Sequence, residues 1–439
     1  MNIFAKDYHL VSDPEKVQTQ AIQAAIDACA ESGGGTVYFE PGIYRSGTIY
    51  LRSNTYLHLP PMCIIKGSDN FDDYNEADAW PQNWAWPPEH ASGKHLIVAV
   101  EIENAGIMGG GTIDGNGKFF GFREEPGFWR PSQMVYLCES THIRLRNLEL
   151  INSPYWTCYV HGCEDVMITG VHIKNNPEVQ NGDGIDIDAS SKVIVSDCLI
   201  DTEDDCITLR CNRDLIGYLK NSDKILEDVT ITNCQLHTSG CNAFRIGVGD
   251  GKIRNCTISN IVVRESAKGI CLESRYTFNS DEKPGCQIEN ISFNNVYLEC
   301  KCPLFLASQC DALTNLKAPS IRNIRLSNFT ISAEHNIVVQ ANEGSVVENI
   351  SFNNVIMEMR GIPECVDQYG YGEWDYRTSP AAFYVANAQK VSLNNVQINV
   401  EESESPVHIG VIAQKTNVTL NYVNAEKAGM EMPVLEQRN

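Results

Sequence analysis

The stretch Glu289-Asn290-Ile291-Ser292-Phe293-Asn294-Asn295 decides the fold, because it returns unchanged at residues 348–354. Each copy alternates apolar and polar residues, which is typical of a short β-strand, and ends in asparagines that tolerate the left-handed backbone of a turn. Weaker copies occupy residues 142–147, 165–170, 228–233, 390–395 and 416–421. Repeats of one strand–turn unit predict an all-β solenoid, a right-handed parallel β-helix in which equivalent asparagines stack as ladders.

The length of 439 residues would ordinarily indicate two or three domains. A solenoid can exceed the usual size of one domain because each coil packs only on its neighbours, so we predict a single domain over residues 1–439. Residues 13–32 predict a helix that covers the first coil. Asp13 can cap this helix, Pro14 suits its first turn, and an apolar stripe follows before the glycines at 33–35.

Three segments rich in aromatic residues interrupt the repeats, namely residues 70–91, 117–133 and 361–377. Their tryptophans include Trp84, Trp129 and Trp374. Sugar rings stack on aromatic faces, so we predict that these loops wall a sugar-binding cleft. The alternative is that they pack over the solenoid as satellite hydrophobic clusters.

Composition narrows the possible partners. The net charge of −22 argues against nucleic acid or an anionic membrane surface, and no apolar run reaches the ~20 residues of a membrane span. Residues 1–7 lack the pattern of a signal peptide, so we expect a cytoplasmic protein. The 17 scattered cysteines predict buried free thiols and match no zinc-finger spacing, so no metal or other cofactor is expected. Nothing in the sequence indicates an oligomeric state.

Two acidic clusters, at residues 181–186 and 203–206, mark the candidate site. Asp183 lies 21 residues before Asp204, which is about one solenoid turn. Stacked strands are about 4.8 Å apart, so Asp183, Asp204 and Asp205 would crowd together, and repulsion would keep one of them protonated. A site that holds one acid and one base is suited to glycoside hydrolysis.

The strand after Asp183 should place Ile185 and Ile187 inside the coil and Asp186 and Asp188 outside it. A regular strand would send one of the adjacent residues Asp204 and Asp205 inward, so we predict a kink or bulge that turns both outward. Each aspartate alone could be an ordinary turn residue. Their grouping favours catalysis.

At these residues the chain resembles glycoside hydrolase family 28, the polygalacturonase family. That family carries Asn-Thr-Asp, Asp-Asp, Gly-His-Gly and Arg-Ile-Lys on successive coils of a right-handed β-helix. Here Asn181-Gly182-Asp183 matches the first motif and Asp204-Asp205 the second, and residues 152–156 and 130–131 are similar to segments of bacterial members. The resemblance covers most of the chain. It implies an inverting hydrolysis in which Asp204 is the general acid and Asp183 and Asp205 activate water.

The later motifs depart from the family. Asn242 stands where the histidine is expected, and Cys271 and Glu273 stand where the arginine and lysine that hold a uronate carboxylate are expected. Glu273 would repel that carboxylate, so we expect a neutral sugar whose hydroxyls donate to Glu273. Arg210, Arg245 and Arg275 could still supply a cation from another direction.

These features together predict an inverting glycosidase that acts inside the cell on pectin-derived or related oligosaccharides. The loop at 70–91 could close one end of the groove and make cleavage exo-acting. A lyase or epimerase on the same scaffold is an alternative, distinguished by chelator sensitivity and an unsaturated product. A non-catalytic glycan-binding solenoid is another, distinguished by binding that survives Asp204→Asn.

Overall fold

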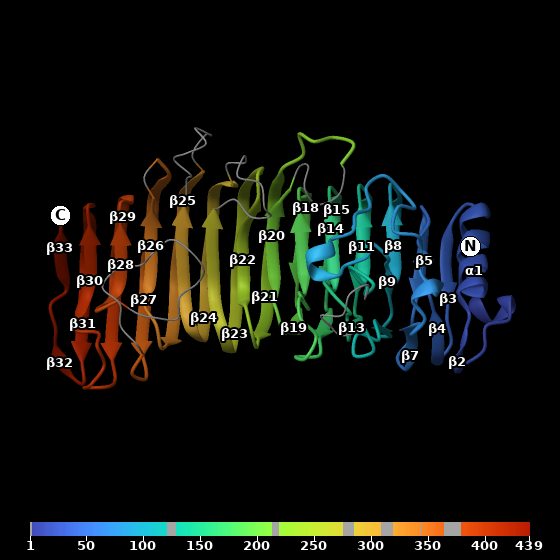
Figure 1. Ribbon diagram of the computed structural model, residues 1–439, viewed down its shortest axis with the longest axis horizontal. Coiled ribbons are helices and arrows are strands. Elements are labelled where there is room, and N and C mark those ends of the chain that lie inside the picture. Colours follow the sequence, from blue (N-terminus) through green and yellow to red (C-terminus); the bar gives the residue numbers. More distant parts are fainter. Residues whose placement is uncertain are drawn as a thin grey trace. The chain divides into compact units, whose positions relative to one another are not determined.

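The computed structural model describes residues 2–120, 129–212, 219–274, 285–308, 319–342, 344–363 and 379–439. Contacts divide the chain into two compact units, each described here by itself. The first unit comprises residues 1–208 and 213–230, and the second comprises residues 209–212 and 231–439. Parallel strands dominate both units and confirm the predicted all-β fold, a parallel β-helix (Figure 1).

Three ladders of parallel strands build the first unit. One contains β1 (Asn2–Phe4), β3 (Gly35–Tyr38), β6 (Thr55–His58), β9 (Glu103–Met108), β12 (Thr141–Arg146), β15 (Glu164–Thr169) and β18 (Ser191–Ser196). The next contains β2 (Asp13–Val17), β4 (Gly42–Ser46), β7 (Cys63–Gly67), β10 (Thr112–Asp114), β13 (Glu149–Ile151), β16 (His172–Lys174) and β19 (Leu199–Thr202). The third contains β5 (Ile49–Tyr50), β8 (Ile97–Val100), β11 (Val135–Cys138), β14 (Cys158–His161) and β17 (Ile185–Asp188).

In the third ladder, the strand register places apolar side chains beside apolar side chains of the next coil. Cys158 pairs with Ile185 and Val160 with Ile187, which gives one face of buried apolar side chains. The other face carries larger and more polar residues, because Tyr159 pairs with Asp186 and His161 with Asp188. The predicted alternation along residues 185–188 is therefore confirmed, and the second face carries the candidate site.

One helix, α1 (Thr19–Glu31), lies against β1 and β3 at the start of the first unit (Figure 1). The prediction of a helix here is confirmed, but its predicted start at Asp13 is wrong, because residues 13–17 form strand β2. The side chain of Gln18 bonds to both the N–H and the C=O of Val11, which holds the approaching chain extended until residue 18. The 3₁₀ helices η1 (Ala5–Tyr8), η2 (Phe71–Asp73) and η3 (Pro87–Glu89) are short.

Strands in the second unit are longer. They are β22 (Asn242–Gly249), β23 (Lys252–Ser274), β24 (Gln287–Ser308), β25 (Ser320–Ala333), β26 (Ile337–Ala341), β27 (Val346–Met359), β28 (Ala381–Ala386), β29 (Gln389–Val400), β30 (Ile409–Gln414), β31 (Val418–Lys427), β32 (Met430–Glu431) and β33 (Leu435–Arg438). Strands β20 (Ile207–Cys211) and β21 (Leu226–Thr238) contain residues of both units. Asparagines with positive φ, such as Asn290 (58°) and Asn295 (57°), let one strand turn a corner.

These asparagines form the predicted ladders. The Nδ2 atom of Asn290 donates to Oδ1 of Asn255 at 3.2 Å, and Asn323 donates to Asn290 in the same way at 2.9 Å. Asn349 donates to Asn323 at 2.7 Å and extends the row by one more coil. Every coil in the row thus satisfies the amide of the next.

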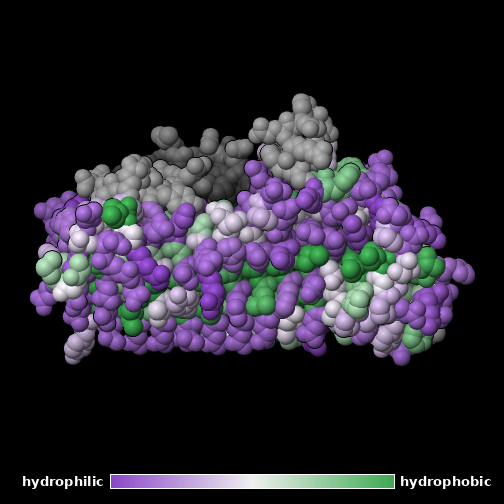
Figure 2. Space-filling model, turned by 90° about the horizontal axis from the view of Figure 1, so that it is seen from below, coloured by the Kyte–Doolittle hydropathy of each residue, from purple (hydrophilic) through white to green (hydrophobic). Residues whose placement is uncertain are grey.

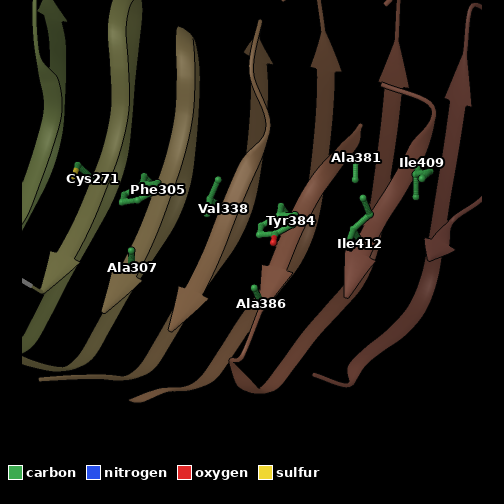
Figure 3. Packing of buried hydrophobic residues seen from close by; sticks show 9 residues of the cluster. All are labelled: Cys271, Phe305, Ala307, Val338, Ala381, Tyr384, Ala386, Ile409 and Ile412. Atoms are coloured by element: carbon green, nitrogen blue, oxygen red, sulfur yellow. The ribbon is translucent and has the colours of Figure 1, made fainter. Parts of the chain in front are cut away.

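A second apolar face lies on the opposite side of the ladder from the interior of the second unit. Phe383 packs edge-on against Phe352 across the interior, and its strand neighbour Tyr384 points the other way. A cluster of buried side chains gathers there, as Figure 3 shows, namely Cys271, Phe305, Ala307, Val338, Ala381, Tyr384, Ala386, Ile409 and Ile412. The sheet is therefore buried on both faces in this region.

The face of the molecule in Figure 2 is mainly hydrophilic, with apolar residues in small groups. The fifteen cysteines within the described residues are all free, and every one except Cys241 is buried, as predicted. No helix in the described ranges is long and apolar enough to cross a bilayer.

Candidate active site

The three candidate catalytic aspartates lie on adjacent coils of the first unit. Asp183 directly precedes β17, and Asp204 and Asp205 lie between β19 and β20. The backbone N–H of Gly184 donates to the carbonyl of Asp205 at 2.9 Å, so the two acidic segments run side by side. The predicted one-coil separation of the clusters is therefore confirmed, whereas the catalytic roles stay predictions.

Gly184 permits this close approach. A Cβ atom at this position would lie 2.4 Å from the carbonyl oxygen of Cys206 and 2.8 Å from Cγ2 of Ile200. No side chain fits at such distances without movement of the backbone. Gly184, in the first acidic cluster, therefore sets how near Asp183 comes to the second acidic cluster.

Asp204 and Asp205 occupy an irregular segment. The hydroxyl of Thr202 donates to the carbonyl of Asp204 at 2.7 Å, and the N–H of Asp205 donates to Oδ1 of Asp204 at 2.8 Å. A carboxylate oxygen of Asp204 lies within 4.8 Å of one of Asp205, so both side chains face one region. This agrees with the predicted break in the strand. Asp205 is buried and Asp204 is half-buried, so the exposed member of the pair is the one predicted to meet the leaving group.

Asn175 ties the Asp183 segment to the preceding coil. Its Nδ2 donates to Oγ1 of Thr157 at 2.7 Å and to the carbonyl of Gly182 at 2.9 Å, while its Oδ1 accepts from the N–H of Ser153 at 3.0 Å. The N–H of Thr157 also donates to the carbonyl of Asp183 at 2.9 Å. The backbone on both sides of Asp183 is thus fixed by buried hydrogen bonds.

Two charged side chains that sequence reasoning did not assign lie beside this segment. Arg130 is fully buried; its Nη2 donates to Oδ1 of Asn181 at 2.7 Å, and its Nη1 donates to the carbonyl of Gln180 at 2.6 Å. Glu203 lies beside the backbone N–H groups of Asn181 and Gly182. Burial raises the pKa of Glu203, while these two N–H groups and the charge of Arg130 oppose the rise. The sequence signals were the position of Glu203 next to Asp204 and the similarity of residues 130–131 to segments of bacterial family members.

The segment at 70–91 packs over the polar face of the third ladder. Trp80 contacts His95 and Tyr136 with ring centroids 5.7 Å away in each case, and the Tyr136 hydroxyl donates to the carbonyl of Gln82 at 3.0 Å. The ring centroid of Trp84 lies 6.2 Å from that of Trp156. The segment is therefore a packed aromatic cluster, as one of the two interpretations predicted. Its Trp84 also lies close to the coil that carries Asp183, so the other interpretation, a wall of the cleft, stays a prediction.

The other predicted cleft loops are described in part. Trp129 is exposed, at 36% of its surface, and Phe120 packs edge-on against Tyr74 with centroids 6.1 Å apart. Trp374, Arg275 and most of the loop at 361–377 lie outside the described residues.

His95 contacts the segment at 70–91, and its burial makes the stability of the protein sensitive to acid. Its Nδ1 lies 3.0 Å from the carbonyl of Gln133 and its Nε2 lies 3.0 Å from Oδ1 of Asn83, and burial lowers its pKa to about 3. The unfolded chain takes up a proton below pH about 6.5, whereas the folded protein does not, so stability falls from pH 6.5 toward 3.

We expect this histidine to cost about 1.4 kcal/mol of unfolding free energy per pH unit within that window. His95→Phe, followed by denaturant unfolding at several pH values, should remove that part of the slope. The control is His172→Gln, which alters an exposed histidine of the same unit. Equal slopes for wild type and His95→Phe would contradict the assignment.

Asp186 and Asp188 face away from the interior as predicted, but neither is open to solvent. Both are fully buried. Oδ2 of Asp188 accepts from the Tyr159 hydroxyl at 2.6 Å and lies 3.3 Å from Nδ1 of His161. These outward acids therefore belong to a covered polar network in the first unit.

In the second unit, Arg245 and Glu273 form a buried ion pair. Nη2 of Arg245 lies 3.3 Å from Oε2 of Glu273, and its Nη1 donates to the carbonyls of Ile246 and Glu273, also at 3.3 Å. Register places Arg245 beside Cys271. Two residues predicted to bind substrate thus neutralise each other, whereas Asn242 and Arg210 are buried on β22 and β20.

Comparisons with known proteins agree with this arrangement. The family model described as glycosyl hydrolases family 28 matches residues 66–314. The chain is 21% identical over 289 residues to polygalacturonase QRT2 of Arabidopsis thaliana, a match that covers 59% of this chain and 65% of that protein. It is 27% identical over 220 residues to a probable polygalacturonase of Vitis vinifera, covering 48% of this chain and 44% of that one. The chain thus spans less than two thirds of either relative.

The fold is also found in solved structures. An exopolygalacturonase from Thermotoga maritima aligns with a TM-score of 0.66 at 16% identity, over 98% of this chain and 93% of that one. At this identity, the likeness shows the fold alone, and the chemistry has to be argued from the residues of this chain.

Proposed function

Because the chain belongs to glycosyl hydrolases family 28, we propose that it is an inverting glycosidase that cleaves pectin-derived oligosaccharides. The observation that carries the proposal is the hydrogen bond between Gly184 and Asp205, which places Asp183 beside the Asp204–Asp205 pair. The polygalacturonases among its relatives support a pectic substrate.

The proposed reaction needs one acid and one base. Asp204 donates its proton to the glycosidic oxygen while the bond from that oxygen to the anomeric carbon breaks. A water molecule attacks the same carbon from the opposite side, and Asp183 with Asp205 takes up the proton of that water. Loss of a proton from the base and its return to Asp204 through solvent completes the cycle with inverted configuration.

We propose a neutral sugar at the subsite that binds a uronate elsewhere in the family. The support is the Arg245–Glu273 ion pair, because Arg245, which pairs in register with Cys271, already has a buried carboxylate as its partner. A uronate would have to compete with Glu273 for that arginine. Sugar hydroxyls would meet no such competition.

We further propose that the enzyme removes sugars from chain ends and works inside the cell. The roof formed by residues 70–91 supports exo action, since it covers part of the third ladder in the unit that holds the acids. The free cysteines support a reducing compartment.

The test is product analysis on a panel of neutral and acidic pectic oligosaccharides, with long polygalacturonate as a further substrate. We expect release of monosaccharides with inverted configuration, measured by NMR of the anomeric proton. We also expect little early loss of polymer viscosity. Retention of configuration, or an unsaturated product, would overturn the hydrolytic mechanism. Rapid loss of viscosity would overturn exo action alone, and a preference for acidic substrates would overturn the neutral subsite.

A further inference from the structure

Arg130 is the most heavily bonded cation near the candidate acids within the described residues of the first unit. Besides Gln180 and Asn181, it donates through Nη1 to the carbonyl of Pro154 and through Nε to the carbonyl of Glu89, both at 3.1 Å. Its guanidinium carbon lies 4.7 Å from the centroid of the Tyr155 ring. A planar fork with donors in several directions can serve four acceptors at once, whereas a lysine ammonium is a single point with three donors.

Asn181 is held from two sides by this arrangement. Its side-chain Oδ1 accepts from Arg130, and its backbone N–H lies beside the carboxyl group of Glu203. Its backbone is left-handed, with φ of 58°, a conformation that needs such support in a residue other than glycine. The side chain is partly exposed.

The bond to Arg130 also decides which end of the amide is available. Because Oδ1 is occupied by a donor, the other end of the group is the Nδ2 amino group. Nδ2 has no hydrogen-bond partner in the part of the chain that the structure describes. Asn181 therefore presents two N–H donors, two residues before Asp183, which suits an oxygen of a sugar.

We propose that Arg130 is a positioning residue that locks Asn181 with its amide donor turned toward the substrate and thereby holds the loop that carries Asp183. This proposal rests on the proposed glycosidase function for its kinetic consequences. Arg130 itself is buried behind Asn181 and acts through it. The ligand chemistry implied for Asn181 is a hydroxyl or ring oxygen of the sugar bound over Asp183.

The first test is Arg130→Lys, with Arg144→Lys as the matched control. Arg144 also belongs to the first unit and also bonds two backbone carbonyls and a carboxylate, those of Ile143 and Asp165, but away from the acids. We expect kcat/KM to fall on the order of 10²-fold in Arg130→Lys, the effect of a small misplacement of reacting groups, and to stay near wild type in the control. Equal activity of both variants would overturn the proposal.

A double variant separates positioning from a general loss of packing. In an Asn181→Ala background, Arg130→Lys should change kcat/KM by less than about threefold, because the residue through which it acts is gone. A full additional loss of about 10²-fold in this background would overturn the proposal.

Asn181→Asp tests the donor without disturbing the lock. The aspartate keeps an oxygen for Arg130 but replaces the donor by an acceptor, so KM should rise about tenfold, the value of one hydrogen bond. Unchanged KM and kcat would overturn the orientation of the amide.

Hydrogen exchange gives a readout that needs no substrate. The amides of Gly182 and Gly184 should exchange faster in Arg130→Lys than in wild type or Arg144→Lys, and should remain protected in Asn181→Asp. If no substrate is cleaved but exchange follows this order, the proposed function fails and the lock stands. If turnover is found but exchange is the same in all variants, the lock fails and the function stands.

Discussion

We expect Asp204→Asn to lower kcat by roughly 10²–10⁴-fold, the usual contribution of a general acid, and to leave KM within a few fold. Asparagine has nearly the same shape, and its Oδ1 can still accept the hydrogen bond from the N–H of Asp205, so the fold is kept. The amide has no proton to give to the glycosidic oxygen. The measurement is steady-state kinetics on the best substrate of the panel.

A control variant and a second substrate test whether the expected loss of activity is specific to Asp204. Asp201→Asn alters an exposed aspartate in strand β19, shortly before Asp204, and should keep wild-type kcat. A substrate with a good leaving group needs little protonation, so it should recover most of the activity of Asp204→Asn but little of that of Asp183→Asn. If Asp204→Asn kept more than a third of wild-type kcat, Asp204 would not be the acid.

We expect Glu273→Ala to lower the unfolding free energy of the second unit by about 3–5 kcal/mol, because it leaves the charge of Arg245 buried without its partner. Glu273 is 2% exposed and Arg245 is 8% exposed, so water cannot replace the lost carboxylate. The loss of stability is measured by denaturant unfolding, with far-ultraviolet circular dichroism as the signal.

The matched control is Glu289→Ala, whose partner Lys252 also lies on β23. This ion pair is about one-third exposed on each side and should contribute less than about 1 kcal/mol. Replacing both members of the buried pair, with Arg245→Met and Glu273→Leu, should recover most of the stability. A loss below 1 kcal/mol in Glu273→Ala would show that the pair is not desolvated. In folded Glu273→Lys, an unchanged preference between neutral and acidic sugars would count against the proposed subsite.

The sequence predicted the features that local pattern determines. Alternation with asparagine at each corner indicated the solenoid, since every coil meets the same steric demand at residues such as Asn290 and Asn349. The spacing of Asp183 and Asp204 placed them on neighbouring coils because 21 residues is close to the length of one coil, such as the 23 residues from Val135 to its register partner Cys158. The start of α1 was missed because Gln18 is fixed by Val11, a contact that has no counterpart in helix propensity.

The supporting shell of the site was beyond such patterns. Arg130 meets Asn181 across 51 residues, and Arg245 meets Glu273 across 28. Neither pairing follows from period or composition, because any charged residue on those coils could have faced solvent. The sign of Glu273 suggested repulsion of a substrate, whereas the structure places its carboxylate against a cation of the same chain.

The asparagine rows of the second unit determine which insertions and deletions leave every side-chain amide paired. In each of the bonds from Asn290 to Asn255, from Asn323 to Asn290 and from Asn349 to Asn323, the later coil donates to the earlier one, so the row has a direction and every interior member is equivalent. A whole coil copied in frame would bring one donor and one acceptor and leave every amide matched. A fragment of a coil would orphan one amide on each side. Descendants of such a gene can therefore gain or lose length in whole-coil steps.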